Sequence, residues 1–408
     1  MSYIGQGLRR QETHARVASS DWSDHVRRRR SDDNGRTWSS WQQVYEEAPT
    51  LNGFTQSGGP SQDGTGPLDP VSGRLIKPVF QRVIRGEPRE AMHLLWQGDR
   101  RFCDHGFYQL SDDDGESWGE AHMLKYEAGP DFDPQDWGAA DFFRSNEMYI
   151  GGAAVLANGT VAISATIPVP CRDAEDEKVP SVFPNDYREG CVAGALCFVG
   201  RWDADLNNYR WQTSTPMFLP RRQSTRGLVE LDLTQLQDGR LLLLMRGSNT
   251  GLDPLECPSR RWYAISEDGG LSWGPVTDMR WDTGATLYSP ASIAHTFRSH
   301  RTGKLYWVGN IPEVPPVGNS PRYPLQIVEI DETAAVPSFK RDTLTTIDDR
   351  DPARDSEHLQ VSNFSVVDDR DSGRVEIYLI RLGERGGGDD VWTADACRYL
   401  LELHATEV

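Results

Sequence analysis

Short apolar runs recur along the chain, each preceded by a turn that contains glycine, and helical periodicity is weak almost everywhere. Such turns occupy 71–75, 157–161, 237–241, 302–305 and 371–375. Each predicts a β-hairpin turn that leads into an apolar strand, because glycine readily adopts the positive φ such turns require. Their glycines lie 86, 80, 64 and 70 residues apart, so the pattern predicts a repeated all-β unit.

A second pattern, S-x-D-x-G-x-x-W, occurs three times. Its aspartate is placed to accept hydrogen bonds from turn N–H groups, its glycine to supply a positive φ, and its tryptophan to pack the turn against a neighbouring sheet. We call these turns the corner segments and expect them to be structural. Their motif residues are Ser31, Asp33, Gly35 and Trp38; Ser111, Asp113, Gly115 and Trp118; and Ser266, Asp268, Gly270 and Trp273.

The two patterns together predict one β-propeller domain over residues 1–408. Five hairpins and the first corner segment give six units of about 68 residues, enough for a four-stranded antiparallel blade with one long loop. Seven blades are the alternative. Pro-, Asp- and Gly-rich segments near 128–147 and 168–190 are expected to be loop insertions on one face. The C-terminal run at 398–404 is expected to close the ring by pairing with N-terminal strands.

Composition narrows the class of protein. The chain is 37% hydrophobic and 10% aromatic, which is enough to form a core, and it has no apolar run of membrane-spanning length. Lys and Arg number 43 against 61 Asp and Glu, and a net charge of −18 argues against a nucleic-acid partner. The six cysteines form no C-x-x-C pair, and no metal-binding motif occurs, so no metal or cofactor is expected. No signal peptide is visible, which favours a cytoplasmic location unless one was removed.

In a propeller, ligands bind over the central channel, which is lined by the ends of the inner strands. Counting seven or eight residues beyond each hairpin glycine reaches the far end of the second strand of each blade. Three of these positions hold Arg246, Asn310 and Arg381. Two guanidinium groups and an amide at equivalent positions predict a polar centre that binds an anion.

The corner segments resemble the Asp boxes of the sialidase (neuraminidase) superfamily, and the likeness in architecture covers the whole chain. In that superfamily the boxes are structural. The segment from Glu230 to Arg246 is similar to the sialidase stretch in which a glutamate activates the nucleophile and an arginine grips the substrate carboxylate. Arg322, after a Pro-rich loop, resembles a further carboxylate-binding arginine. The resemblance therefore implies these roles for Glu230, Arg246 and Arg322.

The chain also departs from the sialidase pattern. The N-terminal F/Y-R-I-P motif is absent, and the nearest arginines are Arg9, Arg10 and Arg16. The nucleophilic tyrosine is expected in the run 358–366, where Val361 occupies its position. The double displacement through a tyrosyl intermediate therefore cannot be carried over to this chain. His358 and Asn363, in the same run, remain candidates for substrate binding.

Two kinds of chemistry stay open. Hydrolysis needs a pair of carboxylates, and Glu230 with Asp232 is the first candidate pair because residues two apart on a strand share a face. Glu147 or Asp141 is an alternative second carboxylate. Elimination at a uronic acid, for example beside rhamnose, needs a base close to the C5 proton. The candidate bases are His14, which we expect on the inner strand of the first blade, with His105, His295 and His358.

The sequence thus predicts an exo-acting, sialidase-like glycoside hydrolase that cleaves a terminal residue of a carboxylate-bearing glycan. A polysaccharide lyase and a non-catalytic glycan-binding propeller are the alternatives. The expected partner is an acidic oligosaccharide or polysaccharide, with neither a nucleic acid nor a membrane. The sugar, the linkage and the oligomeric state are left open by the sequence.

Overall fold

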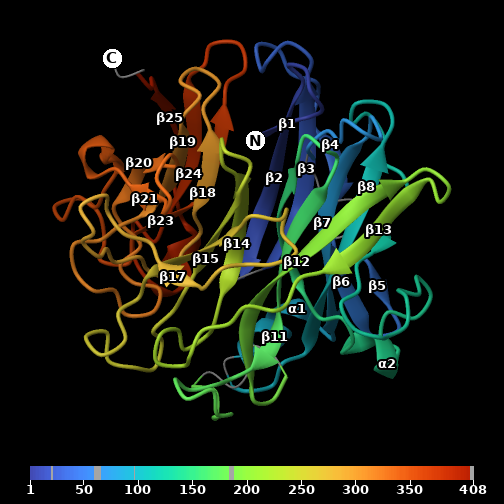
Figure 1. The fold of residues 1–408 in the computed structure, drawn as a ribbon, viewed down its shortest axis with the longest axis horizontal. Helices are drawn as coiled ribbons and strands as arrows, with labels where there is room; N and C mark the ends of the chain where they lie inside the picture. The colour runs from blue at the N-terminus through green and yellow to red at the C-terminus, as the bar shows by residue number, and fades with distance from the viewer. Residues whose placement is uncertain (20–21, 59–65, 96, 183–187, 405–408) are drawn as a thin grey trace.

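The computed structural model describes residues 1–19, 22–58, 66–95, 97–182 and 188–404, whose strands form six antiparallel sheets around one axis (Figure 1). We number these sheets blades one to six in chain order. Blades one to three contain β1 (Ser2–Tyr3), β2 (Arg10–Ser19), β3 (Trp22–Ser31) and β4 (Gln42–Tyr45); β5 (Thr50–Leu51), β6 (Phe54–Gly58), β7 (Leu75–Arg85), β8 (Phe102–Ser111) and β9 (His122–Met123); and β10 (Tyr149–Val155), β11 (Val161–Pro170), β12 (Cys191–Asp203) and β13 (Asn208–Thr213).

The second half of the chain continues the ring. Blades four to six contain β14 (Val229–Gln235), β15 (Leu241–Arg246), β16 (Arg261–Ser266) and β17 (Thr277–Asp278); β18 (His295–Arg298), β19 (Leu305–Asn310), β20 (Leu325–Asp331), β21 (Ser338–Phe339) and β22 (Thr345–Asp348); and β23 (Gln360–Asp368), β24 (Val375–Leu382) and β25 (Ala396–Leu401). The six-bladed, four-stranded antiparallel propeller is therefore confirmed. Blades two and five carry an additional short strand, and the sheet of blade six has three strands among the described residues.

Helices are few and short. They are α1 (Pro88–Leu95), α2 (Ala140–Phe143), and the 3-10 turns η1 (Arg341–Thr343) and η2 (Gly388–Trp392). In the part of the chain that the structure describes, none has the length and apolar character needed to cross a membrane.

The five hairpin glycines and the three corner segments lie on one face of the ring, which we call the turn face. Each glycine precedes the second strand of its blade, counted from β6 in blade two, and has a positive φ between 65° and 93°. The corner segments connect the third and fourth strands, so antiparallel topology brings them to the same face. The second strands end at the opposite face, where the loops between β9 and β10 and between β11 and β12 also lie.

These two loops are the predicted insertions near 128–147 and 168–190. The second insertion begins later than expected because β11 continues to Pro170, and its residues 183–187 lie outside the described part of the chain. An ion pair of 2.6 Å between Arg188 and Glu127 joins the two loops.

The three corner segments share one hydrogen-bond pattern. In each, the serine hydroxyl donates to the aspartate and accepts the N–H of the glycine. The second aspartate oxygen accepts from the hydroxyl of the residue directly before the tryptophan, which is Thr37, Ser117 or Ser272. The serine-to-glycine bond is 2.8 Å long in all three. Hydrogen bonds from the side chain and backbone of the same residue lower the pKa of Asp33 and Asp113 to about 2, so these aspartates remain charged acceptors.

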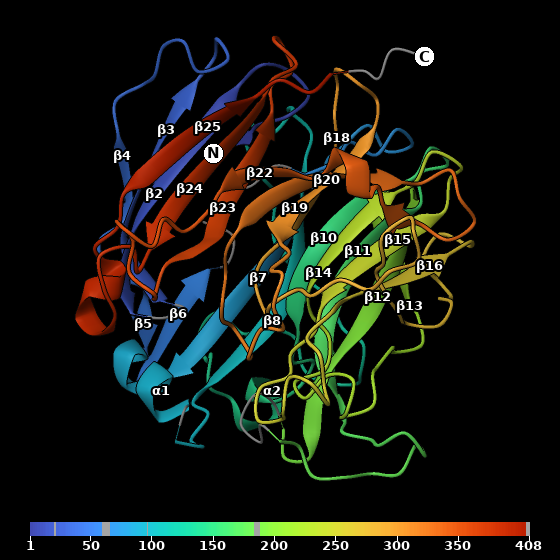
Figure 2. The ribbon, with the colours of Figure 1, turned by 90° about the vertical axis from the view of Figure 1, so that its left-hand side faces the viewer.

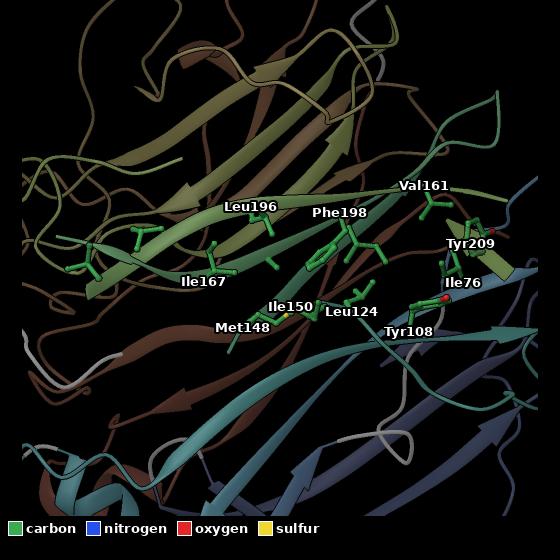
Figure 3. Packing of buried hydrophobic residues seen from close by; sticks show 14 of the residues in the cluster. Ile76, Tyr108, Leu124, Met148, Ile150, Val161, Ile167, Leu196, Phe198 and Tyr209 are labelled. Carbon is green, nitrogen blue, oxygen red and sulfur yellow. The ribbon is translucent and has the colours of Figure 1, made fainter. Parts of the chain in front are cut away.

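The core lies between the blades. Figure 3 shows one cluster formed by blades two and three, in which Met148 and Ile150 lie side by side and Tyr108 lies beside Ile76 and Tyr209. Phe198, on β12, is fully buried in the same cluster. Alternate residues of each strand face opposite neighbours, so blades three, four and five each contribute apolar side chains to two such layers.

The ring is closed by side chains and not by the strand exchange that the sequence suggested. β25 pairs with β24 of its own blade, with Ile377 opposite Tyr399. The N-terminal strands β1 and β2 pair with each other. Arg10 of blade one instead forms a buried ion pair with Glu376 of blade six, and Asn34 donates to Asp369 over 2.8 Å. The two terminal blades lie side by side in Figure 2, with β24 and β25 in red beside β2 and β3 in blue.

Candidate functional site

Glu230 and Arg246 form an ion pair on the face of the ring opposite the turn face. Arg246 is the last residue of β15 and lies opposite Val229, at the start of the inner strand β14. The β14–β15 register shifts between Val229 and Asp232, and within this bulge Glu230 has a φ of +50°. A left-handed backbone is unfavourable for glutamate, and strain of this kind concentrates at functional sites.

Arg261 lies next to this pair. It is the first residue of β16 and the cross-strand partner of Arg246, and only 2% of it is exposed. Its Nη2 donates to Ser289 Oγ over 3.3 Å and to Ser292 O over 3.0 Å, and its guanidinium lies 5.6 Å from the ring of Trp307. Burial lowers the pKa of Arg261 to about 10, against the opposing influence of the Glu230 carboxylate.

Arg322 reaches the same region from blade five. Its Nη2 donates to Ala291 O over 2.7 Å, and its Nη1 donates to Gln360 Oε1 over 3.0 Å. Ala291 directly precedes Ser292, whose carbonyl accepts from Arg261. One short segment before β18 therefore binds both arginines. Of the residues predicted for carboxylate binding, Arg246 is the strand partner of Arg261, and Arg322 binds the same segment as Arg261.

Asp232 completes the group that we call the charge cluster: Glu230, Asp232, Arg246, Arg261 and Arg322. Asp232 is half-buried on β14, and its negative charge acts on Arg261 together with that of Glu230. Glu230 Oε2 and Asp232 Oδ2 are buried and have no hydrogen-bond partner in the part of the chain that the structure describes. Three guanidinium groups against two carboxylates leave the cluster one positive charge, which favours an anionic ligand.

Asn310 and Arg381 occupy the predicted second-strand ends, but their side chains are engaged within the fold. Asn310 is fully buried, and its Nδ2 donates to Pro324 O over 2.9 Å and to Arg322 O over 3.2 Å. It therefore holds the segment that carries Arg322. The shared register is confirmed for these positions, whereas a shared anion-binding role is not supported by their contacts.

Arg381 is surrounded by three carboxylates. It pairs with Asp348, with Asp355 at 2.7 Å and with Glu384 at 3.1 Å. Burial by itself would lower the pKa of Arg381, but hydrogen bonds to Asp348 and Asp355 outweigh it and raise that pKa. The guanidinium is therefore neutralised by the protein and is poorly placed to attract a further anion.

The run that resembles the tyrosine-bearing strand of sialidases lies at the start of blade six. Val361 is fully buried in an apolar cluster, and its N–H donates to Arg322 O over 3.0 Å. Asn363 is half-buried on the inner strand β23, opposite Ile380. The side chain of His358 is 55% exposed in the loop before β23, close to Gly387.

His14 is not placed as predicted. It lies on β2, the second strand of blade one in the sheet order, and β1 holds the first position with only two residues. The side chain is 49% exposed, pairs with Glu12 at 2.8 Å and lies 4.5 Å from the ring of Trp41. β1 pairs only with Arg10 and Gln11, whereas His14 pairs with Arg27 of β3.

The other candidate acids and bases differ in accessibility. His105 is fully buried and stacked on Phe142 with ring centroids 4.3 Å apart, and burial lowers its pKa to about 4. Glu147 is also buried and forms an ion pair with Arg100. Burial raises the pKa of Glu147 in spite of that arginine. His295 is exposed at the start of β18, the inner strand that lies beside β14.

Sequence reasoning missed Arg261. The available signal was the run Arg260-Arg261-Trp262 at the start of a third strand, where the register places Arg261 opposite Arg246. Because strand alternation sends Arg261 and Trp262 to opposite faces of the blade, the arginine meets the charge cluster while the tryptophan joins the apolar layer toward blade three.

A cavity of about 460 Å³ on blade four is lined by Arg260 and Trp262 but by no member of the charge cluster. Another of about 510 Å³ lies between blades one and two and is lined by residues that include Trp22, Phe54 and Glu87. No group of three or more His, Cys, Asp or Glu side chains with metal-binding geometry occurs among the described residues. The charge cluster, and not a cavity, therefore defines the candidate site.

No protein-family model matches the sequence, and no curated protein matches it either. Solved structures share its fold. The NanB sialidase of Streptococcus pneumoniae aligns with a TM-score of 0.53 at 12% identity, over 92% of this chain and 64% of that chain. A leech intramolecular trans-sialidase aligns with a TM-score of 0.51 at 11% identity, over 96% and 66%. A protein of unknown function from Dyadobacter fermentans aligns with a TM-score of 0.52 at 14% identity, over 94% and 84%. The chain thus spans less than two thirds of either sialidase and is similar to them in its propeller fold.

Proposed function

We propose that this chain is a carbohydrate-active enzyme that cleaves a terminal residue from a carboxylate-bearing glycan. The charge cluster is the observation that carries the proposal. It combines a strained glutamate, a second carboxylate and three arginines on the face of a propeller whose fold resembles sialidases. A polar group that is buried without a partner is costly, and a bound ligand would satisfy several such groups at once.

Arg246 is the first candidate for holding the substrate carboxylate. Only 10% of its side chain is exposed, and its present partner is Glu230. Its Nε has no hydrogen-bond partner among the described residues. A guanidinium binds a carboxylate most strongly through two parallel hydrogen bonds. A substrate carboxylate that takes up this arrangement would release Glu230 from Arg246.

Glu230 and Asp232 are the candidate acid and base. Hydrolysis needs one carboxyl group to protonate the leaving oxygen and a second to activate water or to attack the sugar. Release of Glu230 from Arg246 would free that carboxyl group to face the leaving oxygen. Val361 has no nucleophilic atom, so the proposal uses no tyrosyl intermediate.

Elimination at a uronic acid is the second candidate. It is favoured by one observation, the exposed imidazole of His295 on the inner strand beside β14. In that reaction the arginines would stabilise the charge that develops on the uronate carboxylate, while His295 would take the proton from C5.

A digest of acidic glycans distinguishes these reactions. The panel contains sialosides, uronic-acid-capped oligosaccharides and rhamnose-capped oligosaccharides, with products measured by mass and by ultraviolet absorbance. Products that together contain one added water indicate hydrolysis, and an unsaturated uronate without added water indicates elimination. Absence of any product would reject the enzymatic proposal and leave a glycan-binding propeller as the working function.

Substitution of Glu230 tests the site itself. We expect Glu230→Gln to abolish hydrolysis while it preserves the fold, because the amide has nearly the same shape and no acidic proton. Glu267→Gln is the matched control, since Glu267 is exposed in the corner segment of the same blade on the turn face. Full turnover by Glu230→Gln would show that the catalytic group lies elsewhere.

A further inference from the structure

Arg261 is a buried cation that the fold does not pair directly with a carboxylate. None of the carboxylates in the described residues forms an ion pair with it, and its Nε has no hydrogen-bond partner among them. Removal of a guanidinium from water is expensive unless charge and hydrogen bonds compensate for it. Some feature of the surroundings must therefore stabilise this position.

The compensation comes from two directions. On one side, Glu230 and Asp232 of β14 place two negative charges around the guanidinium. On the other side, Ser289 Oγ and Ser292 O accept hydrogen bonds from Nη2. Arg261 thus connects the inner strand of blade four with the segment that precedes the inner strand of blade five.

The same segment receives Arg322. Ala291 O accepts from Arg322 Nη2 over 2.7 Å, one residue before the carbonyl that binds Arg261. A displacement of residues 289–292 would therefore move the hydrogen-bond partner of Arg322. The position of one anion-binding candidate depends in this way on a guanidinium that is too deeply buried to contact a glycan itself.

We infer that Arg261 is a positioning residue of the candidate site, which lies beside the Glu230–Arg246 pair and places Arg322 through the 289–292 segment. The inference rests on the proposed function, because it gives Arg261 a role in glycan binding. It also makes a separate statement about the protein alone, namely that Arg261 and Asp232 are energetically coupled.

Arg261→Met and Arg261→Lys test the first statement, with Arg260→Met as the matched control. Arg260 is the preceding residue, is half-buried and donates to Leu287 O, away from the cluster. Binding of sodium glucuronate and of N-acetylneuraminic acid is measured by NMR titration. We expect Arg261→Met to lower the affinity for the sugar acids by about tenfold or more. Arg261→Lys should restore part of that affinity, and Arg260→Met should leave it unchanged within about twofold.

A double-mutant cycle tests the second statement through urea unfolding of Arg261→Met, Asp232→Asn and the double variant. In the wild type, Asp232→Asn removes a compensating charge and is expected to lower the urea midpoint. In the Arg261→Met background it removes an uncompensated carboxylate and is expected to leave the midpoint unchanged or to raise it. If Arg261→Met alone does not fold, a folded double variant would show that the unpaired Asp232 carboxylate caused the loss of stability.

The outcomes separate the inference from the function. Additive effects in the cycle, or equal losses of affinity in Arg261→Met and Arg260→Met, would overturn the positioning role. If the wild type neither binds the two sugar acids nor cleaves any glycan of the panel, the proposed function fails, and the positioning role in a glycan site fails with it. Non-additivity would then still show that Arg261 and Asp232 are energetically coupled.

Discussion

Arg10 Nη1 donates to Glu376 Oε1 over 2.9 Å, although the two residues are 366 positions apart in the chain. Both side chains are 3% exposed, and the pair joins the second strand of blade one to the second strand of blade six. The ring is thus closed by a buried ion pair, which Tyr3 and Asp369 extend through further contacts with Arg10.

Loss of this pair should destabilise the propeller. Arg10→Met leaves the buried carboxylate of Glu376 without its partner, so we expect the free energy of unfolding to fall by about 3–5 kcal/mol. Urea unfolding measures the change. Arg36→Met is the control, because Arg36 joins Asp371 across the same blade boundary with 67% of its side chain exposed. Its loss should cost less than about 1 kcal/mol. Equal losses would mean that Arg10 does not close the ring.

The corner segments should contribute to stability without affecting the site. Ser266 is 1% exposed, and its hydroxyl donates to Asp268 and accepts the N–H of Gly270. Ser266→Ala leaves that N–H unsatisfied and should cost about 1–3 kcal/mol of unfolding free energy. Ser40→Ala, at an exposed position, should change it by less than about 0.5 kcal/mol. A loss of glycan affinity with unchanged stability would contradict the structural role.

His105 should make the protein sensitive to acid. Burial lowers its folded-state pKa to about 4, whereas an unfolded histidine titrates near its ordinary value of 6.5. Between these two values the unfolded chain binds more protons, so stability should fall as the pH drops from about 6.5 to about 4. The loss attributable to this residue is on the order of 3 kcal/mol. This loss of stability should be absent at neutral pH.

Urea midpoints measured across this range should show a shallower pH slope for His105→Gln than for the wild type. His93→Gln, on the exposed side of α1, provides the control and should retain the wild-type slope. An identical slope in all three proteins would mean that His105 is protonated within the folded protein.

Arg381 and Arg246 should respond differently to the same substitution. Arg381→Met leaves Asp348, Asp355 and Glu384 close together without their shared cation, so we expect a stability loss of about 3 kcal/mol or more. Its affinity for glucuronate should not change. Arg246→Met should instead lower that affinity about tenfold or more. NMR titration and urea unfolding of both variants separate the two roles. A loss of affinity in Arg381→Met would show that the Arg381 guanidinium contributes to anion binding in spite of its three carboxylate partners.

Features that depend on neighbours in sequence were predictable. A corner segment needs only eight residues, because its serine, aspartate and glycine bind one another across the turn. The hairpin glycines mark a register that reached the strand ends at Arg246, Asn310 and, within one residue, Arg381. In blades two and three, β7 and β11 continue beyond the counted positions. The Glu230–Arg246 pair follows from the same logic, since a hairpin brings its two strands together whatever the rest of the chain does.

Features that depend on partners from other blades were not predictable. Arg246, Asn310 and Arg381 occupy equivalent positions in sequence, yet Arg381 meets carboxylates from distant loops and Asn310 meets backbone carbonyls. His14 was expected on the inner strand because the two-residue strand β1, which takes the first position in the sheet, is too short to be recognised in the sequence. Arg261 gave no motif of its own.

The sequence by itself determined the repeated blade, its turns and the hairpin that carries Glu230 and Arg246, because short-range hydrogen bonding and strand alternation are encoded locally. The tertiary structure alone decided that Arg381 is neutralised by three carboxylates and that Arg261 is buried without an ion-pair partner among the described residues. It also decided that Arg10 and Glu376 close the ring. These outcomes depend on the charges that reach each position from other blades, and closing the ring brings those charges together over hundreds of residues of chain.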